Sequence, residues 1–301
     1  MNSTASESSG FIAIDKPAGI TSFDVIRRLR RITGIRKIGH CGTLDPFATG
    51  LLICCIGSYT RLAKYVESEE KAYYATIQLG AQSETGDTEG TIIKTADVPS
   101  QLIDPEQVQQ TALSLSELPV PAYSAIKLNG TRAYTLARSG VEMDMPIRAT
   151  KISVFQLIAW EDGSIINDVS QLSYRCTVSK GTYIRSLSEW LAQQIGTLGY
   201  TIQLRRESIG VTSIEKAVTL EALNPDNWKQ SLISPRQVLS RLTSLELDDV
   251  QEKCISNGGD IAIPSDIQIT NPTCALYNTT NKLLAIGEVS IDSIHPIIVL
   301  I

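Results

Sequence analysis

The sequence lacks the features that define several large classes of protein. No run of 18 or more apolar residues occurs in its 301 residues, which excludes a membrane-spanning helix. Only two histidines are present, His40 and His295, and the six cysteines include no Cys-x-x-Cys pair, so we expect no metal site. No internal repeat is visible, and low-complexity sequence is confined to the first ten residues.

Residues 1–10 are rich in serine and have no apolar core, which predicts a flexible tail and not a signal peptide. Free thiols in a chain without an export signal are typical of a reducing compartment, so we expect a cytoplasmic protein. A hydrophobic content of 43% with 20% charged residues predicts a globular chain, long enough for more than one domain.

Negative charge is concentrated at the C-terminal end. Residues 241–301 contain eight Asp and Glu residues against three Arg and Lys residues, which accounts for the whole net charge of −5. The first 240 residues are therefore neutral overall and hold local basic clusters. The acidic balance of the whole chain consequently does not exclude a nucleic-acid partner.

The spacing of apolar and turn residues predicts strands and helices along most of the chain. The expected strands are 11–15, 73–79, 90–94 as the hairpin partner of 73–79, 147–160, 172–178, 261–263, 274–277, 283–286 and 297–301. The expected helices begin after Thr21 and at Asp104, span 133–138 and 183–195, and run from about Asp248 to Asn257. The polar segment 80–90, bounded by glycines, is expected to be a surface loop.

The helix expected after Thr21 has one apolar side and one strongly basic side. Val25, Ile26 and Leu29 recur at helical spacing and predict the buried side. The other side and the residues after it hold six basic side chains within eleven positions, namely Arg27, Arg28, Arg30, Arg31, Arg36 and Lys37. Such a stripe is either a phosphate-binding surface or an ordinary solvated helix face, and the sequence alone favours neither.

The segment from Lys37 to Leu52 is the clearest candidate for a functional loop. It places His40 and Asp45 five residues apart between glycines, directly before an apolar run that would attach the loop to a buried element. Asp45 could be a nucleophile presented by this loop. Alternatively, Asp45 and Pro46 could begin a helix as its N-cap and first residue, and His40 could be a packing residue.

Several distant segments combine Tyr, Arg and Lys with glycine, a composition that suits stacking on bases and pairing with phosphates. In chain order they resemble the motifs of the bacterial TruB family of tRNA pseudouridine synthases over about residues 11–215. The matching motifs are Gly39-His40-Cys41-Gly42-Thr43-Leu44-Asp45-Pro46, Lys71-Ala72-Tyr73-Tyr74, Leu79-Gly80, Asp87-Thr88-Glu89-Gly90, Pro121-Ala122-Tyr123-Ser124-Ala125-Ile126-Lys127, Asn129-Gly130, Ala133-Tyr134, Ala137-Arg138, Gly140, Ser179-Lys180-Gly181-Thr182-Tyr183-Ile184-Arg185-Ser186-Leu187 and Leu204-Arg205-Arg206.

This resemblance implies a fold and a reaction. The fold is an α/β (α+β) catalytic domain over residues 11–240, with a mixed, largely antiparallel sheet flanked by helices, followed by a small β-rich domain of the PUA type over 245–301. The reaction converts uridine 55 in the T arm (the TΨC loop) of tRNA to pseudouridine. No redox change or hydrolysis occurs, so the resemblance implies no metal and no other cofactor. We expect a monomer whose partner is tRNA.

The resemblance also assigns roles to individual residues. Asp45 is the nucleophile, which attacks either C1′ of the sugar or C6 of the base, and Arg185 pairs with it. Tyr73 stacks on the target uracil and is a candidate proton acceptor. Tyr183 and Leu204 hold the flipped base, and His40 helps the nucleotide to leave the stack. Plausible phosphate contacts, each equally readable as an ordinary surface charge, are Lys16, Lys127, Arg138, Lys180 and Arg205.

The chain departs from the family pattern at few places. Cys41 stands where threonine or another small residue is common, and the C-terminal tail has few of the cations that strong RNA binding requires. The insert-like segment 100–145, expected to contact RNA, favours the tRNA branch over synthases that act on ribosomal RNA. Two rival functions remain: a glycoside hydrolase, which normally needs a second carboxyl group as acid/base, and an RNA-binding or tRNA-folding protein without catalysis.

Overall fold

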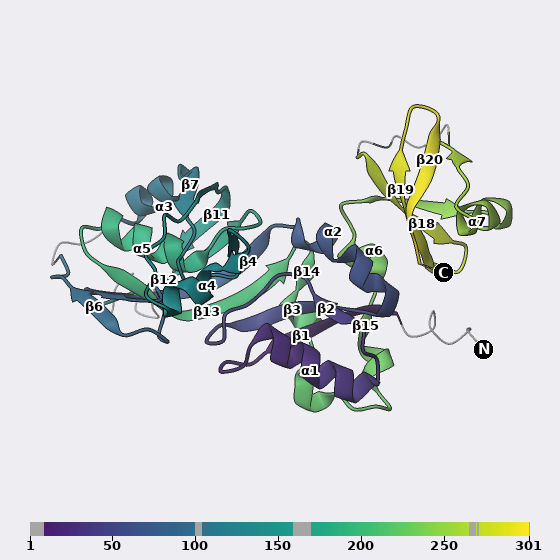
Figure 1. Ribbon diagram of the computed structural model, residues 1–301. Coiled ribbons are helices and arrows are strands. Elements are labelled where there is room, and N and C mark those ends of the chain that lie inside the picture. Colours follow the sequence, from purple (N-terminus) through teal and green to yellow (C-terminus); the bar gives the residue numbers. More distant parts are fainter. Residues whose placement is uncertain (1–8, 100–103, 159–169, 265–268, 270, 301) are drawn as a thin grey trace.

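The computed structural model describes residues 9–99, 104–158, 170–264, 269 and 271–300 (Figure 1). Its helices are α1 (Ser22–Thr33), α2 (Ala63–Glu67), α3 (Pro105–Leu113), α4 (Ala133–Arg138), α5 (Ile184–Gln194), α6 (Pro235–Val238) and α7 (Asp249–Ser256). Short 3-10 helices are η1 (Gly57–Leu62), η2 (Ile214–Lys216), η3 (Leu220–Ala222) and η4 (Trp228–Ser231). None of the helices in these ranges is both long and apolar enough to cross a membrane.

A nine-stranded sheet forms the centre of the molecule. Its order is β11 (Ile152–Leu157), β12 (Gln171–Val178), β4 (Lys71–Leu79), β13 (Gly199–Ile209), β3 (Thr49–Ile56), β1 (Gly10–Lys16) and β15 (Leu232–Ile233), with β14 (Thr212–Ser213) beside β13 and β2 (Ile38–His40) beside β3. The named strands of this sheet pair antiparallel except for β13 and β3, which are parallel. The expected mixed, largely antiparallel sheet is therefore confirmed.

The parallel contact between β3 and β13 joins the two halves of the sheet. It is short, with Thr49 opposite Arg205 and Gly50 opposite Arg206. Gly50 has φ 102°, and a Cβ at this position would lie 2.3 Å from the backbone oxygen of Arg206. A side chain would clash at this approach, and the left-handed φ favours glycine as well. The junction thus depends on Gly50, five residues after Asp45.

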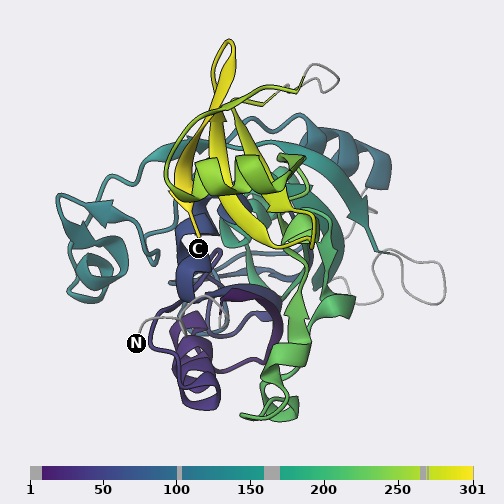
Figure 2. The same cartoon turned by 90° about the vertical axis from the view of Figure 1, so that its right-hand side faces the viewer.

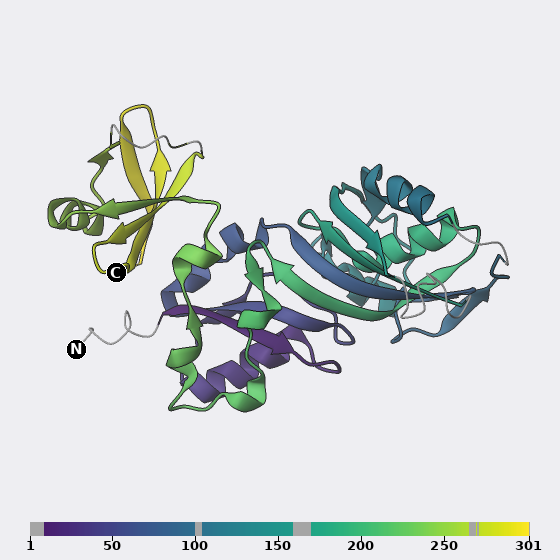
Figure 3. The ribbon, with the colours of Figure 1, turned by 180° about the vertical axis from the view of Figure 1, so that it is seen from behind.

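Helices cover the two halves of the sheet separately, as Figure 3 shows from behind. Helix α1 buries Val25, Ile26 and Leu29 against strands β1 and β3. Thr21 and Asp24 form the expected capping box at its start, and Gly34 ends it in the left-handed conformation. At the other end of the molecule, α3 and α5 pack on β4, β11, β12 and β13.

The C-terminal residues form a second sheet, confirming the β-rich tail (Figure 2). Its order is β16 (Thr243–Leu247), β18 (Thr273–Asn278), β19 (Leu283–Val289), β20 (Ser293–Val299) and β17 (Ile261–Ala262), with α7 packed beside it. Tyr277 lies under the guanidinium of Arg236 on α6, and the Arg61 side chain donates to the Val299 carbonyl. These contacts hold the small sheet against the end of the large one.

Three elements differ from the sequence predictions. Residues 90–94 were expected to pair with 73–79, but β6 (Ile92–Thr95) pairs with β5 (Ala81–Ser83), because β4 is already flanked by β12 and β13. The predicted strand 147–160 is two strands, β10 (Ile147–Ala149) paired with β7 (Glu117–Pro119) and then β11, and its last two residues lie outside the described ranges. The long central strand β13 was not predicted.

The insert-like segment 100–145 contains α3, β7 and a small hairpin. The hairpin consists of β8 (Lys127–Leu128) and β9 (Thr131–Arg132), with Asn129 and Gly130 at positive φ in its turn, and α4 follows it directly. Residues 100–103 of this segment and residues 1–8 of the expected flexible tail lie outside the described ranges. The Asn-Gly pair therefore allows a two-residue hairpin turn.

Candidate active site

Asp45 lies in the loop between β2 and β3, directly before the junction of the two sheet halves. Residues 41–48 form no helix, so the alternative in which Asp45 caps a helix is wrong. Leu44 and Ala48 are buried on either side of Asp45, and the chain then continues as the buried strand β3. The Asp45 side chain itself stays 33% exposed. The loop is attached to the core while its carboxylate remains accessible.

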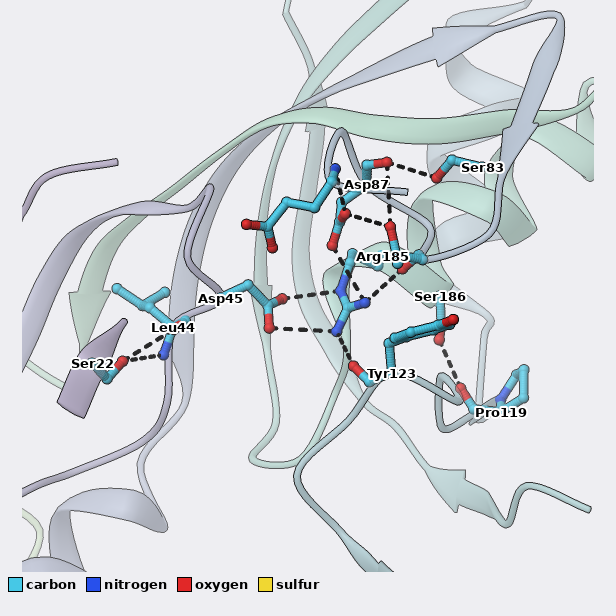
Figure 4. Close-up of polar contacts among 11 residues, drawn as sticks. Ser22, Leu44, Asp45, Ser83, Asp87, Pro119, Tyr123, Arg185 and Ser186 are labelled. Carbon is cyan, nitrogen blue, oxygen red and sulfur yellow. Dashed lines mark hydrogen bonds and ion pairs between the residues drawn. The ribbon is translucent and has the colours of Figure 1, made fainter. Parts of the chain in front are cut away.

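Arg185, the second residue of α5, contacts the Asp45 carboxylate with two of its nitrogens (Figure 4). Its Nε lies 3.0 Å from Asp45 Oδ2, and its Nη2 donates to Oδ1 at 3.4 Å. The Arg185 side chain is only 3% exposed. A planar guanidinium in this position orients a carboxylate as well as neutralising it.

The remaining donors of Arg185 bind two other segments of the chain. Nη1 donates to the Thr85 carbonyl at 2.6 Å, and Nη2 donates to the Tyr123 carbonyl at 2.8 Å. Nearby on α5, Ser186 Oγ donates to the Pro119 carbonyl. One guanidinium therefore connects the Asp45 loop to segments 80–90 and 119–127, three regions that the sequence places far apart.

Asp87 is a member of this cluster that sequence reasoning missed. Its side chain is 3% exposed, and its Oδ2 lies 3.4 Å from Arg185 Nη1 (Figure 4). Its Oδ1 accepts hydrogen bonds from Thr85 Oγ1 at 2.5 Å and from the Glu89 backbone at 2.9 Å. The expectation that segment 80–90 is a surface loop is wrong at this point. Asp87 could have been identified from the sequence, because it belongs to one of the motifs that resemble the family.

The electrostatics of Asp45 result from opposing effects. Burial raises the pKa of Asp45, the Arg185 guanidinium lowers it, and the charge of Asp87 raises it. The net effect raises the pKa of Asp45 above its ordinary value, and Arg185 opposes the loss of water that favours the neutral acid. An ionised but weakly hydrated carboxylate is a competent nucleophile.

The turn between β1 and α1 holds the backbone on both sides of Asp45. Ser22 Oγ accepts from the Leu44 N–H at 2.9 Å and donates to the Leu44 carbonyl at 3.0 Å. The Pro46 carbonyl accepts from the Gly19 N–H at 2.8 Å and from Lys16 Nζ at 3.2 Å. Residues 44 and 46 are thereby both fixed by the same turn.

Lys16 is consequently not the surface cation that the sequence suggested. Its exposed fraction is 0%, and Nζ donates to the carbonyls of Pro17, Ile20 and Pro46. Burial lowers the pKa of Lys16 to about 8, with Asp45 the main group that opposes the shift. A side chain whose ammonium is enclosed by three carbonyls cannot also bind a phosphate, so this prediction is wrong.

Replacing Ser22 by Ala should lower kcat by about 10- to 100-fold with little change in KM, because a shift of about 1 Å in a catalytic group can cost that much. The change leaves both backbone groups of Leu44 without a partner in a buried position. Single-turnover kinetics at saturating RNA would measure the loss of rate. Ser68→Ala, which removes one exposed hydrogen bond to the Tyr65 carbonyl, is the matched control. A fully active Ser22→Ala variant would contradict the inference that Ser22 positions the Asp45 loop.

Tyr73 on β4 and Leu204 on β13 lie beside the Asp45 loop. Both belong to the core cluster that contains Leu44 and Ala48. Burial raises the pKa of Tyr73, while the neighbouring Arg206 charge lowers it, and the Asp45 charge contributes to the rise. Tyr183 is half-buried at the start of α5, two residues before Arg185. The structure thus brings Asp45, Tyr73 and Arg185 together, with Leu204 and Tyr183 adjoining them.

His40 is the last residue of β2, opposite Cys54 of β3. Burial and the charge of Arg206 lower the pKa of His40, so its imidazole is neutral at neutral pH. Arg206, which the sequence analysis did not single out, is 1% exposed and donates to the carbonyls of Leu51 and Gly42. It therefore joins the beginning of the catalytic loop to the strand that follows it.

The four other proposed phosphate contacts differ in whether their charge is already paired within the protein. Lys127, Arg138 and Lys180 are exposed, and Arg138 lies over the ring of Tyr134. Arg205 instead forms two hydrogen bonds with the Asp15 carboxylate, at 3.0 and 2.8 Å. Its charge is already compensated within the protein, so Lys127, Arg138 and Lys180 are the better candidates for RNA contacts.

A further carboxyl group lies behind Arg185. Glu189 follows it by one turn of α5, and a Cβ on Gly86 would lie 2.8 Å from its Oε1. Burial raises the pKa of Glu189 to about 7, an effect that Arg185 opposes and the charge of Asp87 reinforces. Ionisation of Glu189 therefore occurs near neutral pH and next to the cluster that holds Asp45.

This pKa predicts a pH dependence of stability. A carboxyl group whose pKa is 4.5 when unfolded and about 7 when folded destabilises the fold progressively as pH rises between these values. Glu189→Gln removes that titration. The unfolding midpoint of the variant should therefore rise relative to wild type between about pH 5 and about pH 8, as thermal unfolding would show. Glu221→Gln, at an exposed ion pair with Arg28, should show no such trend.

No group of three or more His, Cys, Asp or Glu side chains suited to a metal ion occurs in the described part of the chain. The described cysteines are all unpaired thiols, and Cys41 and Cys55 lie with their sulfurs 3.1 Å apart below the catalytic loop. The chemistry that the cluster itself can perform is attack by a carboxylate, with one guanidinium that neutralises and orients it.

Comparison with known proteins identifies the class to which this site belongs. Residues 30–184 match the model of the TruB family pseudouridylate synthase N-terminal domain, a range that includes Asp45, Tyr73 and Asp87. The chain therefore belongs to the TruB family and is a pseudouridine synthase.

Curated relatives support the family assignment over most of the chain. A protein of Syntrophomonas wolfei named tRNA pseudouridine synthase B is 36% identical over 287 residues, which cover 93% of each chain. Proteins of the same name are 36% identical in Syntrophobacter fumaroxidans, covering 81% of this chain and 79% of the relative, and 38% identical in Corynebacterium efficiens, covering 84% of each.

Solved structures confirm the fold. The Cbf5-Nop10-Gar1 complex contains a chain that superposes with a TM-score of 0.70 at 22% identity, covering 97% of this chain and 85% of that one. A chain of the archaeal box H/ACA sRNP Nop10-Cbf5 complex gives a TM-score of 0.67 at 20% identity, covering 97% and 86%. At this level of identity the likeness concerns the fold alone.

Proposed function

We propose that this protein isomerises uridine 55 in the T arm of tRNA to pseudouridine, with Asp45 as the nucleophile. The observation that carries the proposal is the exposed carboxylate of Asp45 held by the buried Arg185 at 3.0 and 3.4 Å. The names of the curated relatives supply tRNA as the substrate. We expect it to act in the cytoplasm as a monomer, through a catalytic domain of residues 11–240.

In this proposal the nucleotide leaves the T loop before Asp45 can reach it, at a cost of a few kcal/mol. Asp45 attacks C1′ of the sugar or C6 of the base, the N-glycosidic bond breaks and the uracil turns. C5 then bonds to C1′, the bond to Asp45 breaks, and C5 loses its proton while N1 gains one. Atoms and electrons balance within the nucleotide, so no co-reactant enters. Burial of the surrounding side chains keeps water away from the reactive sugar.

The other site residues have supporting roles in the proposal. Tyr73 stacks on the uracil and accepts a proton, and Leu204 packs beside it. Tyr183 closes the pocket from the start of α5, and the neutral His40 occupies the side from which the nucleotide left. Asp87 is a positioning residue, because it contacts Arg185 and not the substrate. Lys127, Arg138 and Lys180 contact phosphates from the exposed surface.

The glycoside hydrolase alternative loses support from the same geometry. Its mechanism requires a second carboxyl group that is free to act as acid and base. Asp87, the buried carboxylate of the cluster, is instead occupied by Thr85 Oγ1, the Glu89 N–H and Arg185. Asp87 is therefore not the free second carboxyl group that this mechanism needs.

The test is to incubate the purified protein with an unmodified tRNA transcript and to map pseudouridine by primer extension after carbodiimide treatment. We expect one new stop at the T-arm uridine. A transcript with cytidine at that position is the matched control and should show none. Tight tRNA binding without any stop would favour the alternative of an RNA-folding protein.

A further inference from the structure

The basic stripe of α1 is not used by the proposed reaction, and the structure shows where it lies. Helix α1 begins at Ser22, whose hydroxyl binds both backbone groups of Leu44, the residue next to Asp45. The outer face of α1 therefore starts at the edge of the active site and leads away from it (Figures 1 and 4). Twelve residues of helix extend about 18 Å.

An aromatic side chain stands at the end of α1 that is nearest to the active site. Phe23 is 55% exposed, although it adjoins the buried Ser22. The guanidinium groups of Arg27 and Arg30 lie 5.8 and 5.6 Å from the centre of its ring. A half-exposed ring with two guanidinium groups beside it offers a base an aromatic surface and a phosphate a charge to pair with.

Free positive charge lies at the far end of α1. Arg27 and Arg28 are paired with Asp24 and Glu221, so their charges are partly compensated. By contrast, the exposed side chains of Arg31, Arg36 and Lys37 form no ion pair or hydrogen bond within the described residues. The order along the surface is thus an aromatic ring beside the active site and uncompensated cations farther out.

We propose that this α1 surface (Phe23, Arg27, Arg30, Arg31 and Arg36) binds the part of the substrate RNA that lies outside the T-arm hairpin. The inference rests on the proposed function, since it takes the hairpin to be what enters the active site. RNA that continues from that site along α1 meets first a stacking platform and then phosphate-binding charges. The acidic C-terminal sheet offers no comparable cation cluster among its described residues.

The experiment compares a full-length tRNA transcript with an isolated T-arm hairpin, using Arg31→Glu/Arg36→Glu. For the full transcript we expect Kd and KM to rise about tenfold or more at about 0.1 M salt, with the slope of log K against log salt reduced by about two. For the hairpin both constants should stay within twofold of wild type, and kcat should not change on either RNA. Lys253→Glu, an exposed charge reversal on α7, is the matched control.

Phe23 is tested separately, because its contribution is stacking and not charge. Phe23→Ala should weaken binding of the full transcript severalfold, and Phe23→Trp should restore it, since a larger ring still stacks. An unchanged Kd for the full transcript in the double arginine variant would overturn the proposal. An equal rise of Kd for transcript and hairpin would also overturn it, because the α1 surface would then contact the T arm itself.

Failure of the proposed function gives a different pattern. In that case wild-type protein would form no pseudouridine in either RNA, whereas the comparison of Kd values for transcript and hairpin would still decide whether α1 binds RNA. Thermal unfolding of each variant shows whether charge reversal has disturbed the fold. Because Arg31 and Arg36 are exposed and unpaired, we expect unfolding midpoints close to that of wild type.

Discussion

Asp45→Asn is expected to abolish pseudouridine formation while tRNA binding stays within a few-fold of wild type. Asn keeps the size of Asp and can still accept a hydrogen bond from Arg185, but its amide is not a nucleophile. Removing the nucleophile of an enzyme that works through a covalent step typically costs on the order of 10⁴-fold or more in rate. Single-turnover assays on a tRNA transcript, with filter binding in parallel, measure the two quantities separately.

Asp15→Asn is the matched control for this experiment. Asp15 also binds an arginine through both carboxylate oxygens, Arg205 at 3.0 and 2.8 Å, but at the other side of the β3–β13 junction. We expect it to keep most of the activity. Retention of the wild-type rate by Asp45→Asn would show that Asp45 is not the nucleophile and would move attention to Asp87, the nearest buried carboxylate.

Arg185→Lys should lower the rate by about 10²- to 10⁴-fold, although the positive charge is kept. A lysine ammonium is a point charge, and it cannot reach Asp45, Asp87 and the carbonyls of Thr85 and Tyr123 together. The carboxylates of Asp45 and Asp87 would then share a poorly hydrated site with less positive charge to compensate them. Loss of one partner of a buried ion pair typically costs several kcal/mol.

A pH profile distinguishes this role from simple loss of folding. Arg185 lowers the pKa of Asp45 against the effect of burial, so its replacement should raise that pKa. The rise of the rate with pH, which reports ionisation of the nucleophile, should therefore move to higher pH in Arg185→Lys. Arg175→Lys, at an exposed pair with Glu207, should leave the profile unchanged. An unshifted profile in Arg185→Lys would refute the electrostatic role.

Local structure followed from local sequence where the signals were strong. The helices predicted to begin after Thr21 and at about Asp248 do begin there, each with a capping box at its start. The strand β13 was missed because polar and basic residues interrupt its apolar ones. Its burial depends on β4 and β3 on either side, and these neighbours come from distant parts of the chain.

The site was predictable in part. Asp45 and Arg185 were assigned from their motifs and lie in contact. Lys16 was wrongly taken for a surface cation, because nothing in the residues around it shows that the Pro46 carbonyl, 30 positions later, folds back over its ammonium. Asp87 was overlooked for the same reason: its polar, glycine-bounded segment has the composition of an exposed loop, and contacts with α5 and β13 bury it.

The sequence by itself determined the class of protein, the position of the Asp45 loop, the ends of the main helices and the acidic character of the C-terminal sheet, because these depend on residues close together in the chain. Only the tertiary structure decided which groups surround Asp45. Arg185, Asp87, the Tyr123 carbonyl and the β1–α1 turn come from separate segments, and their contacts arise when the two halves of the sheet meet at the β3–β13 junction. Contacts of that kind depend on packing over long sequence separations, which no local pattern encodes.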